Sequence, residues 1–595
     1  MENVQEKLNK AIDLINSEDF NQAQVLLNEV IQIDENNIEA YKNLGLCEVN
    51  LDNPPAAIEA FEAAVKLDKN DALSLFYLAN CYSRTGEKEK AIDNFEKVIT
   101  LRPDYLDAYK SLAMIYIEFS QVENAIEIAK KAIENESIEK DCSLYYVIST
   151  AYMLKKDYLN AMKNLELGLE LNPEHLLIMN SLGVCYMNVG LYDKSEEVLQ
   201  KAYEIDKTNS LTVYNLGIYF ETTRNYKKAL EFFQKSYAIE PSITMLATLA
   251  NCALKAQEYS TAAALYQNLV MAFPNNSNYR LAYIEAQEAI RNYKEALDSV
   301  NQLLSLDDKN INLTKRKGAL LRKMGFNIES IETFDILIKR GKIDVEIYYN
   351  LAFNYIELGD FDNAKEMFKK CITLEPNNPY VHKDLGVLYL KMNCYEWAIE
   401  EIEEAIKLEN DVAEFHYSRG VALMMLSRIK DGIDAFITSL KLDNEQPDCL
   451  AYLGYAFLLE GDNEKALESL QAALQIAPDN FLAKNHMAKY YFQNKKYEPA
   501  KQFLLDIIEQ TKDDETINML GICCMETQEY EDACGLFSKL IPDYPKNHIL
   551  LVNLAKSEYK TNKINEAKEH LRQALMIYDD YKEALDLLEE INSGK

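Results

Sequence analysis

Hydrophobic and polar positions along this chain follow a pattern that recurs every 34 residues. The pattern is clearest in VEIYYNLAFNYIELGDFDNAKEMFKKCITLEPNN, the segment from Val345 to Asn378, whose residues we number as positions 1 to 34. Apolar residues at positions 4, 7, 8 and 11 form the i, i+3, i+4, i+7 stripe of an amphipathic helix. Gly359 at position 15, followed by Asp360, predicts the end of this helix and a turn.

The second half of the segment predicts another amphipathic helix. Apolar residues stand at positions 17, 20, 24 and 27, and Pro376 at position 32 predicts where this helix ends. Small residues at positions 8 and 20, here Ala352 and Ala364, predict that the two helices approach each other closely. The unit is therefore expected to be a helical hairpin.

Seventeen copies of this unit follow one another in register between Val4 and Tyr581. Position 8 is glycine in eight copies: Gly45, Gly183, Gly217, Gly318, Gly386, Gly420, Gly454 and Gly521. Position 20 is alanine in fourteen copies, and the other three have Ser195, Ser330 and Gly432. Such regularity identifies the chain as an array of one structural unit.

The recurring aromatic, Leu-Gly, Tyr, Ala, Phe and Pro resemble the signature of the tetratricopeptide repeat family, which has the same period. The resemblance covers nearly the whole chain and implies an all-α fold, an α-solenoid superhelix of antiparallel helix pairs. It also implies binding of proteins on the concave face, which the first helix of each repeat lines at positions 2, 5, 6, 9, 12 and 13.

The quality of the repeats divides the chain into five segments. Residues 1–37 hold a leader and a degenerate capping repeat, and residues 38–276 hold repeats 2 to 8. Repeats 9 and 10, residues 277–344, depart most from the pattern and are predicted to form a joint. Residues 345–581 hold repeats 11 to 17, and residues 582–595 are expected to form a closing helix and a fraying tail.

Charge and cysteine content indicate which partners and which cellular compartment the protein can have. The net charge of −33 and the pI near 4.7 argue against nucleic acid as a partner. The first residues do not resemble a signal peptide, and no apolar run is long enough to span a bilayer. Five of the eleven cysteines occupy position 10, where a small side chain packs inside the hairpin, so we expect free thiols in a cytoplasmic protein.

Sequence motifs for catalysis, cofactors or metals are absent. The six histidines do not form metal-binding pairs, and no phosphate-binding or nucleophile motif occurs. We therefore predict a protein that is not an enzyme and that binds no cofactor or metal.

Two binding devices known in the resembled family are also missing. A clamp for a C-terminal carboxylate needs Lys at position 5 and Asn at position 9, but Lys42, Lys110 and Lys383 lack that Asn. The ladder of Asn at position 6 that grips an extended peptide is broken. Only Asn43, Asn215, Asn350 and Asn553 are present.

Apolar residues at concave positions of repeats 11 to 14 are the candidate partner site. The predicted partner-binding residues are Tyr349, Phe353, Val387, Tyr417, Val421, Met424 and Tyr455. Packing between repeats is the alternative reading, especially for the tyrosines at position 5.

A basic group in repeat 10 is a second candidate. Lys315, Arg316, Arg322 and Lys323 stand at concave positions in an acidic protein and are predicted to contact an acidic stretch of a partner, with solvated charge as the alternative. The sequence thus favours a non-catalytic interaction scaffold. The alternative is a structural component of a large assembly, formed through self-association or convex-face contacts.

Overall fold

The computed structural model describes residues 4–511 and 513–593, and over this range it contains α-helices and no strands. The predicted all-α class is therefore confirmed. The first helices of the repeats are α1 (Val4–Asn16), α3 (Ile38–Asn50), α5 (Ala72–Arg84), α7 (Leu106–Glu118), α9 (Cys142–Leu154), α11 (Leu176–Asn188), α13 (Ser210–Thr222), α15 (Ile243–Lys255), α17 (Ser277–Ala289), α19 (Ile311–Lys323), α21 (Val345–Glu357), α23 (Pro379–Lys391), α25 (Ala413–Met425), α27 (Pro447–Glu460), α29 (Phe481–Gln493), α31 (Asp514–Glu526) and α33 (His548–Lys560).

The second helices are α2 (Phe20–Ile33), α4 (Pro54–Leu67), α6 (Lys88–Leu101), α8 (Val122–Glu134), α10 (Tyr158–Leu171), α12 (Tyr192–Ile205), α14 (Tyr226–Ile239), α16 (Tyr259–Ala272), α18 (Tyr293–Leu306), α20 (Asn327–Lys339), α22 (Phe361–Leu374), α24 (Tyr395–Leu408), α26 (Ile429–Leu442), α28 (Asn463–Ile476), α30 (Tyr497–Thr511), α32 (Tyr530–Leu540) and α34 (Ile564–Ile577). Every first helix begins at position 1 and every second helix at position 17, so the predicted register is confirmed throughout.

The turn between the two helices of a repeat has the same backbone form in all repeats. The residue at position 15 has a positive φ in each of them, as the repeat from Val345 predicted with Gly359 (φ 76°). Five of these residues are glycine, but most are not, and Arg224 (φ 62°) is an example. A left-handed residue with a side chain costs about 1–2 kcal/mol, so packing of the hairpin outweighs this local strain.

Close crossing of the two helices explains the small residues. A Cβ on Gly217 would lie 2.6 Å from the ring of Phe233, and the other position-8 glycines meet the side chain at position 24 in the same way. All the position-20 alanines are fully buried. Where serine replaces alanine it donates a hydrogen bond across the crossing, as Ser330 Oγ does to the Gly318 carbonyl (2.7 Å).

The cysteines at position 10 are buried packing residues. Cys47, Cys81, Cys185, Cys252 and Cys523 are almost completely buried, and all eleven cysteines are free thiols. Burial raises the pKa of Cys185 to about 12, which keeps the thiol neutral. The packing interpretation of these residues is therefore confirmed.

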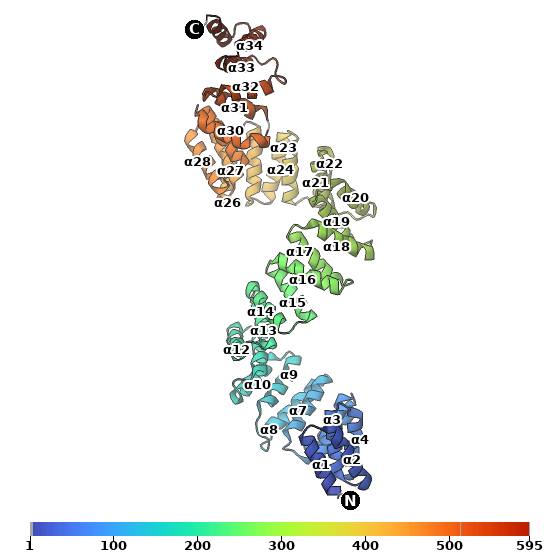
Figure 1. The fold of residues 1–595 in the computed structure, drawn as a ribbon. Helices are drawn as coiled ribbons and strands as arrows, with labels where there is room; N and C mark the ends of the chain where they lie inside the picture. The colour runs from blue at the N-terminus through green and yellow to red at the C-terminus, as the bar shows by residue number, and fades with distance from the viewer. Residues whose placement is uncertain (1–3, 512, 594–595) are drawn as a thin grey trace. The chain divides into compact units, whose positions relative to one another are not determined.

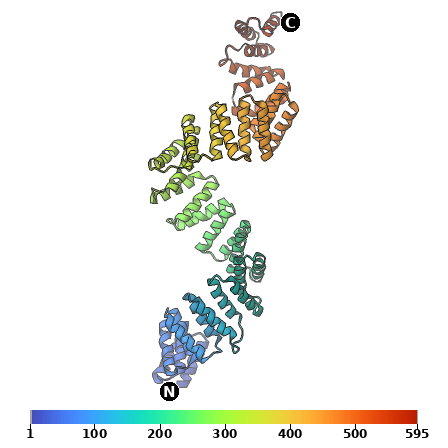
Figure 2. The same ribbon diagram turned by 180° about the vertical axis from the view of Figure 1, so that it is seen from behind.

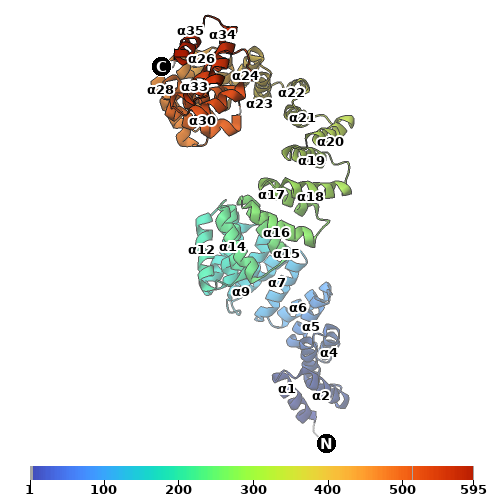
Figure 3. The same cartoon turned by 45° about the horizontal axis from the view of Figure 1, so that its top comes forward.

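The chain forms two compact units, Met1–Ala296 and Leu297–Lys595, and their boundary falls within α18. Within each unit the hairpins follow one another in chain order (Figures 1 and 2). Figure 3 shows, without overlap, two successive hairpins of the second unit, formed by α19 with α20 and by α21 with α22. The boundary lies in repeat 9, inside the predicted joint, whose flexibility stays a prediction.

Both ends of the array differ from the interior repeats. The degenerate first repeat keeps its hairpin because Leu8 and Ala11 pack on α2 and α3. At the other end α35 (Lys582–Ser593) covers the last hairpin and buries Ala584 and Ile591. Residues 1–3 of the predicted leader and 594–595 of the predicted tail lie outside the described residues.

Candidate partner-binding surface

Successive first helices contact one another directly in both units, for example α5 with α7 and α27 with α29. Within each unit, we call the surface formed by the side chains at positions 2, 5, 6, 9, 12 and 13 of the first helices the inner face. The second helices form the outer face. Over the seventeen repeats the inner positions hold as many basic as acidic residues, so the excess of acidic side chains lies elsewhere.

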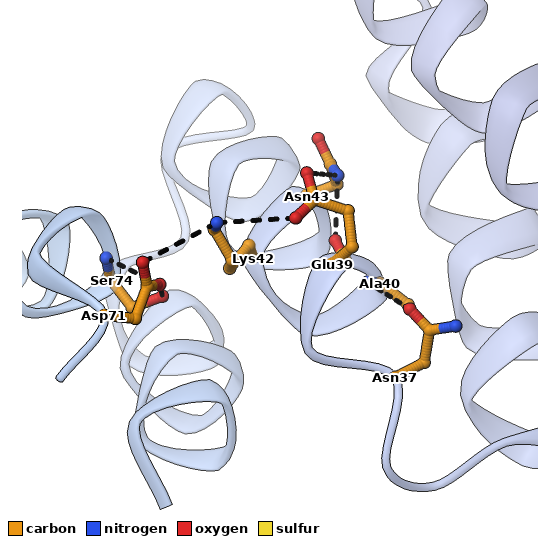
Figure 4. Close-up of polar contacts among 7 residues, drawn as sticks. All are labelled: Asn37, Glu39, Ala40, Lys42, Asn43, Asp71 and Ser74. Carbon is orange, nitrogen blue, oxygen red and sulfur yellow. Dashed lines mark hydrogen bonds and ion pairs between the residues drawn. The ribbon is translucent and has the colours of Figure 1, made fainter. Parts of the chain in front are cut away.

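Lysines at position 5 connect neighbouring repeats along the inner face. Lys42 Nζ lies 3.4 Å from Glu39 and 3.7 Å from Asp71, which caps α5 by accepting a hydrogen bond from the backbone N–H of Ser74 (Figure 4). Lys110 makes the equivalent contact with Asp141 (3.5 Å). Because carboxylates of this chain already occupy these ammonium groups, they are poorly suited to clamp the carboxylate of a partner.

Basic residues of the group predicted in repeat 10 also contact other residues of the chain. Lys315 pairs with Asp344 (3.0 Å) and with Glu346, and hydrogen bonding to Glu346 raises the pKa of Lys315. Arg322 donates a hydrogen bond to Asn350 Oδ1 (3.0 Å) and lies over the ring of Phe353. These contacts within the chain mean that an acidic partner segment would have to compete for Lys315 and Arg322.

Arg316 and Lys323 complete that group. Arg316 is half-buried and Lys323, at the end of α19, is exposed. The four basic residues thus lie on one helix, but only part of their charge is presented to solvent.

Tyr349 and Phe353 of α21 belong to an aromatic cluster. Their rings lie 5.0 Å apart and both contact Phe368, which is fully buried. Tyr349 donates a hydrogen bond to Asp384 of α23, and burial together with this bond raises the pKa of the phenol. Both residues are half-buried, so they connect repeats and also present one edge to the inner face.

The remaining predicted residues fall into two classes. Val387, Tyr417, Val421 and Tyr455 are half-buried and line the inner face, whereas Met424 is only 8% exposed. Met424 packs within the hairpin, where its Cγ would lie 3.2 Å from a Cβ on Gly432. Met424 is thus part of the core, and its contact with a partner stays a prediction, whereas Met425, at position 13, is 47% exposed.

Leu459 was missed by the sequence analysis. It stands at position 13 of repeat 14, the same position as Met425, and is 46% exposed. The signal was present in the sequence, because apolar residues at position 13 occur in consecutive repeats. Val421, Met425, Tyr455 and Leu459 together give the first helices α25 and α27 an apolar inner surface.

His486 of α29 closes this surface on one side. Its ring stacks on Tyr455 at 4.4 Å, and it is 6% exposed with no hydrogen-bond partner for either ring nitrogen in the described part of the chain. Burial, with a smaller contribution from Lys489, lowers the pKa of His486 to about 3. The imidazole is therefore neutral at physiological pH and acts as an apolar ring.

A second apolar inner surface, in repeats 5 to 7, was not singled out from the sequence. The inner positions of α9 and α11 carry no charged residue, and those of α13 carry only Glu221. Leu154, Leu177 and Leu211 are exposed there, beside the half-buried Tyr146, Val184, Tyr214 and Ile218. Apolar character alone therefore does not select repeats 11 to 14.

No group of three or more metal-ligating side chains was found among the described residues. Within the same part of the chain, every helix is too short or too polar to cross a membrane.

Comparison with known proteins gives relatives that align over short segments. The chain is 32% identical over 101 residues to TPR repeat protein oca3 of Schizosaccharomyces pombe, covering 17% of this chain and 36% of that protein. It is 28% identical over 117 residues to RNA polymerase-associated protein CTR9 of Caenorhabditis elegans. This alignment covers 19% of this chain and 10% of that protein. Each alignment thus spans much less than two thirds of the relative.

Solved structures with a similar arrangement of helices include the APC/C hetero-tetramer Cut9–Hcn1, at 14% identity over 93% of this chain and 96% of that chain, with a TM-score of 0.31. Another is YrrB, described as a TPR protein with an unusual peptide-binding site. It has 25% identity over 32% of this chain and 96% of that chain, with a TM-score of 0.27. Both TM-scores are too low to bear on function.

Family models described as tetratricopeptide repeat match segments that together cover more than half of the chain. The matched residues are 14–74, 72–105, 143–175, 177–209, 248–311, 345–378, 367–400, 426–481 and 457–521. The matches to 72–105, 143–175, 177–209 and 345–378 each begin within one residue of the start of a first helix. The chain belongs to the tetratricopeptide repeat family.

Proposed function

We propose that this protein is a non-catalytic scaffold in the cytoplasm that binds a segment of a partner protein on the inner face of repeats 11 to 14. The observation that carries the proposal is the apolar surface of α25 and α27, where Met425 and Leu459 are each nearly half exposed beside Val421 and Tyr455. Exposed apolar side chains on a rigid helical array are typical of protein-binding surfaces.

Polar groups beside this surface would orient the segment. Lys383 pairs with Glu414 (2.7 Å) and with Asp384 (2.8 Å), and Asp384 also accepts the hydrogen bond from Tyr349. This network links α21, α23 and α25 and holds their inner side chains in fixed positions. Preorganisation of this kind lowers the entropic cost of binding.

The basic residues of α19 supply the second part of the proposed site. Lys315, Arg316, Arg322 and Lys323 would attract an acidic flank of the segment and so increase the association rate. The neutral total charge of the inner positions makes such a local basic group effective in a chain of net charge −33.

A photo-crosslinking residue placed at position 425 or 459 tests the proposal with a partner obtained by affinity purification. Both positions should crosslink to the partner, whereas crosslinkers at 464 and 468 on the outer face of α28 should not. Crosslinking only from α28 would overturn the inner-face assignment.

The alternative function is a structural component of a large assembly. Trp397, the single tryptophan, favours it because the side chain is 55% exposed on the outer face of α24. Size-exclusion chromatography with light scattering separates the two functions. A monomer at micromolar concentration would support the scaffold function. A stable oligomer that dissociates when Trp397 is replaced by alanine would support the assembly function.

A further inference from the structure

The outer face of repeats 15 and 16 contains a hollow that the inner-face site does not use. It has a volume of about 340 Å³ and lies between the second helices α30 and α32, over the first helix α31. Its lining residues are Lys501, Leu505, Leu520, Cys524, Glu529, Glu531, Asp532, Gly535, Leu536 and Lys539.

Two departures from the repeat pattern produce this hollow. Position 11 holds a large aromatic ring in most interior repeats, such as Tyr491 in repeat 15, but it holds Cys524 in repeat 16. Position 22 of the same repeat is Gly535, where an added Cβ would meet no atom within 4 Å. Because protein interiors are close-packed, the missing ring and side chain leave an indentation.

The interior of the hollow is apolar. Leu520 and Cys524 form the floor, and burial raises the pKa of the Cys524 thiol to about 11, so the thiol is neutral and behaves as a small apolar group. Leu505 of α30 forms a wall and is 53% exposed. An exposed leucine beside an apolar floor is unfavourable in water and becomes favourable when an apolar side chain covers it.

The mouth of the hollow is acidic. Glu529 is paired with Lys501 (2.7 Å), which also contacts Glu498 (3.0 Å). Glu531 and Asp532, in the first turn of α32, are exposed and have no ion pair among the described residues. Lys539 is the remaining basic residue of the lining and lies two turns further along α32.

We propose that this hollow is a second docking site, for a partner-protein segment that presents one large apolar side chain next to basic residues. The apolar side chain fills the space above Cys524 and Gly535 and covers Leu505. The basic residues lie over Glu531 and Asp532. The site shares no residue with the inner face of repeats 11 to 14, so it adds a binding surface to the proposed scaffold.

The acidic mouth favours a segment with basic residues over an acidic or a purely apolar one. A second copy of the chain would bring another strongly acidic surface to the acidic mouth, and so would an acidic segment of another protein. A purely apolar segment would leave Glu531 and Asp532 without compensation. Basic residues beside an apolar anchor match both parts of the site.

Selection of peptides tests the proposal on the full-length chain. The probe is a phage-displayed library of random 12-residue peptides, and the selected peptides are sorted by their binding to variants. Cys524→Phe restores the ring that other repeats carry at position 11 and fills the hollow. Gly535→Met blocks the mouth of the hollow from an exposed helical position. Because methionine is a good helix former, this variant should fold even if Cys524→Phe does not.

A charge-matched control isolates the acidic mouth. Glu531→Lys with Asp532→Lys should abolish binding at the hollow, whereas Glu464→Lys with Glu468→Lys makes the same change of charge at exposed positions of α28. We expect a class of peptides with a large apolar residue next to Lys or Arg. Their affinity should fall at least tenfold with Cys524→Phe, Gly535→Met and the 531/532 variant, and remain within about twofold with the 464/468 variant.

Three outcomes would overturn the proposal. One is that no selected peptide depends on Cys524→Phe or Gly535→Met. Another is that the dependent peptides are acidic or lack basic residues. The third is that the 464/468 variant weakens binding as much as the 531/532 variant, since binding would then reflect total charge and not this site.

Discussion

The inner faces of repeats 5 to 7 and of repeats 11 to 14 have similar apolar residues and different charges. Both have half-buried tyrosines at position 5, Tyr146 and Tyr214 in the first and Tyr349 and Tyr417 in the second. The first has almost no charged residue at its inner positions. The second contains the network of Tyr349, Asp384, Lys383 and Glu414.

This difference shows what apolar patterning leaves open. Half-buried tyrosines at position 5 and apolar residues at position 9 occur in both regions, because they pack successive first helices together. Polar groups that point toward the inner face add direction and specificity to binding. By this criterion repeats 11 to 14 are the better candidate for a selective site, and repeats 5 to 7 for a less selective apolar one.

The largest expected effect comes from destroying one region while sparing the other. Ala466 of α28 is fully buried, and Ala466→Asp would bury an unpaired carboxylate beside Gly454 at a cost of about 3 kcal/mol or more. In a repeat array the damage stays local, because each repeat contacts only its neighbours. Hydrogen exchange should therefore show loss of protection centred on residues 447–513, with residues 142–222 unchanged.

Uniform loss of protection over both regions would contradict this account. It would mean that the array unfolds as one cooperative body, and that the two inner faces cannot be treated separately. Ala466→Ser is the matched control, because Ser195 and Ser330 occupy the same position in other repeats and are fully buried.

A smaller effect is expected from pH, and one contribution to it comes from His486 in repeat 15. The pKa of His486 is about 3 in the folded chain, below the ordinary value of 6.5, so the unfolded state binds the proton first as pH falls. Stability is therefore fully present above pH 6.5 and is lost progressively toward pH 3. Between pH 6.5 and 5 the loss is about 1.6 kcal/mol. In repeats 5 to 7 the one histidine is His175, which caps α11 by accepting a hydrogen bond from the backbone N–H of Ile178.

His486→Phe isolates this contribution, since phenylalanine keeps a ring against Tyr455 and does not titrate. Hydrogen exchange of α27 and α29 at pH 7 and pH 5 should show weaker protection at pH 5 in the parent and a much smaller change in the variant. Equal losses in both would show that other groups cause the acid sensitivity.

The fold could be predicted from the sequence almost completely. Each repeat contains the residues that mark its own helix boundaries. The register therefore predicts the starts of α19 and α31 as well as that of α21, even though α19 belongs to the degenerate repeat 10. Gly217 and Ala466 could be assigned to the helix crossing because only small residues fit there. Local regularity of this kind needs no knowledge of distant contacts.

The candidate site could be predicted only in part. Position along the helix identified the inner face but did not separate Met424, which turns into the core, from Met425, which is exposed. It also could not show that Lys315 is paired with Asp344 and Glu346. Such details depend on the exact direction of each side chain and on the neighbouring repeat, and one repeat pattern does not encode them.

The central claim is that a partner segment binds the inner face of repeats 11 to 14, and a pair of matched variants tests it most directly. The first replaces Phe353, Val421 and Tyr455 with serine, and the second replaces Tyr146, Val184 and Tyr214. Phe353 and Tyr455 contact buried rings, so thermal unfolding of each variant is measured as well, and Met425→Glu with Leu459→Glu repeats the first test at exposed positions.

The measurement is the affinity of a purified partner for the parent and for both triple variants, at a temperature where all are folded. The account predicts a loss of about tenfold or more, roughly 1.4 kcal/mol, for the variant in repeats 11 to 14 and for the 425/459 variant. The variant in repeats 5 to 7 should bind like the parent. Unchanged affinity in the first two variants, with a loss in the third, would contradict the claim and transfer the site to repeats 5 to 7.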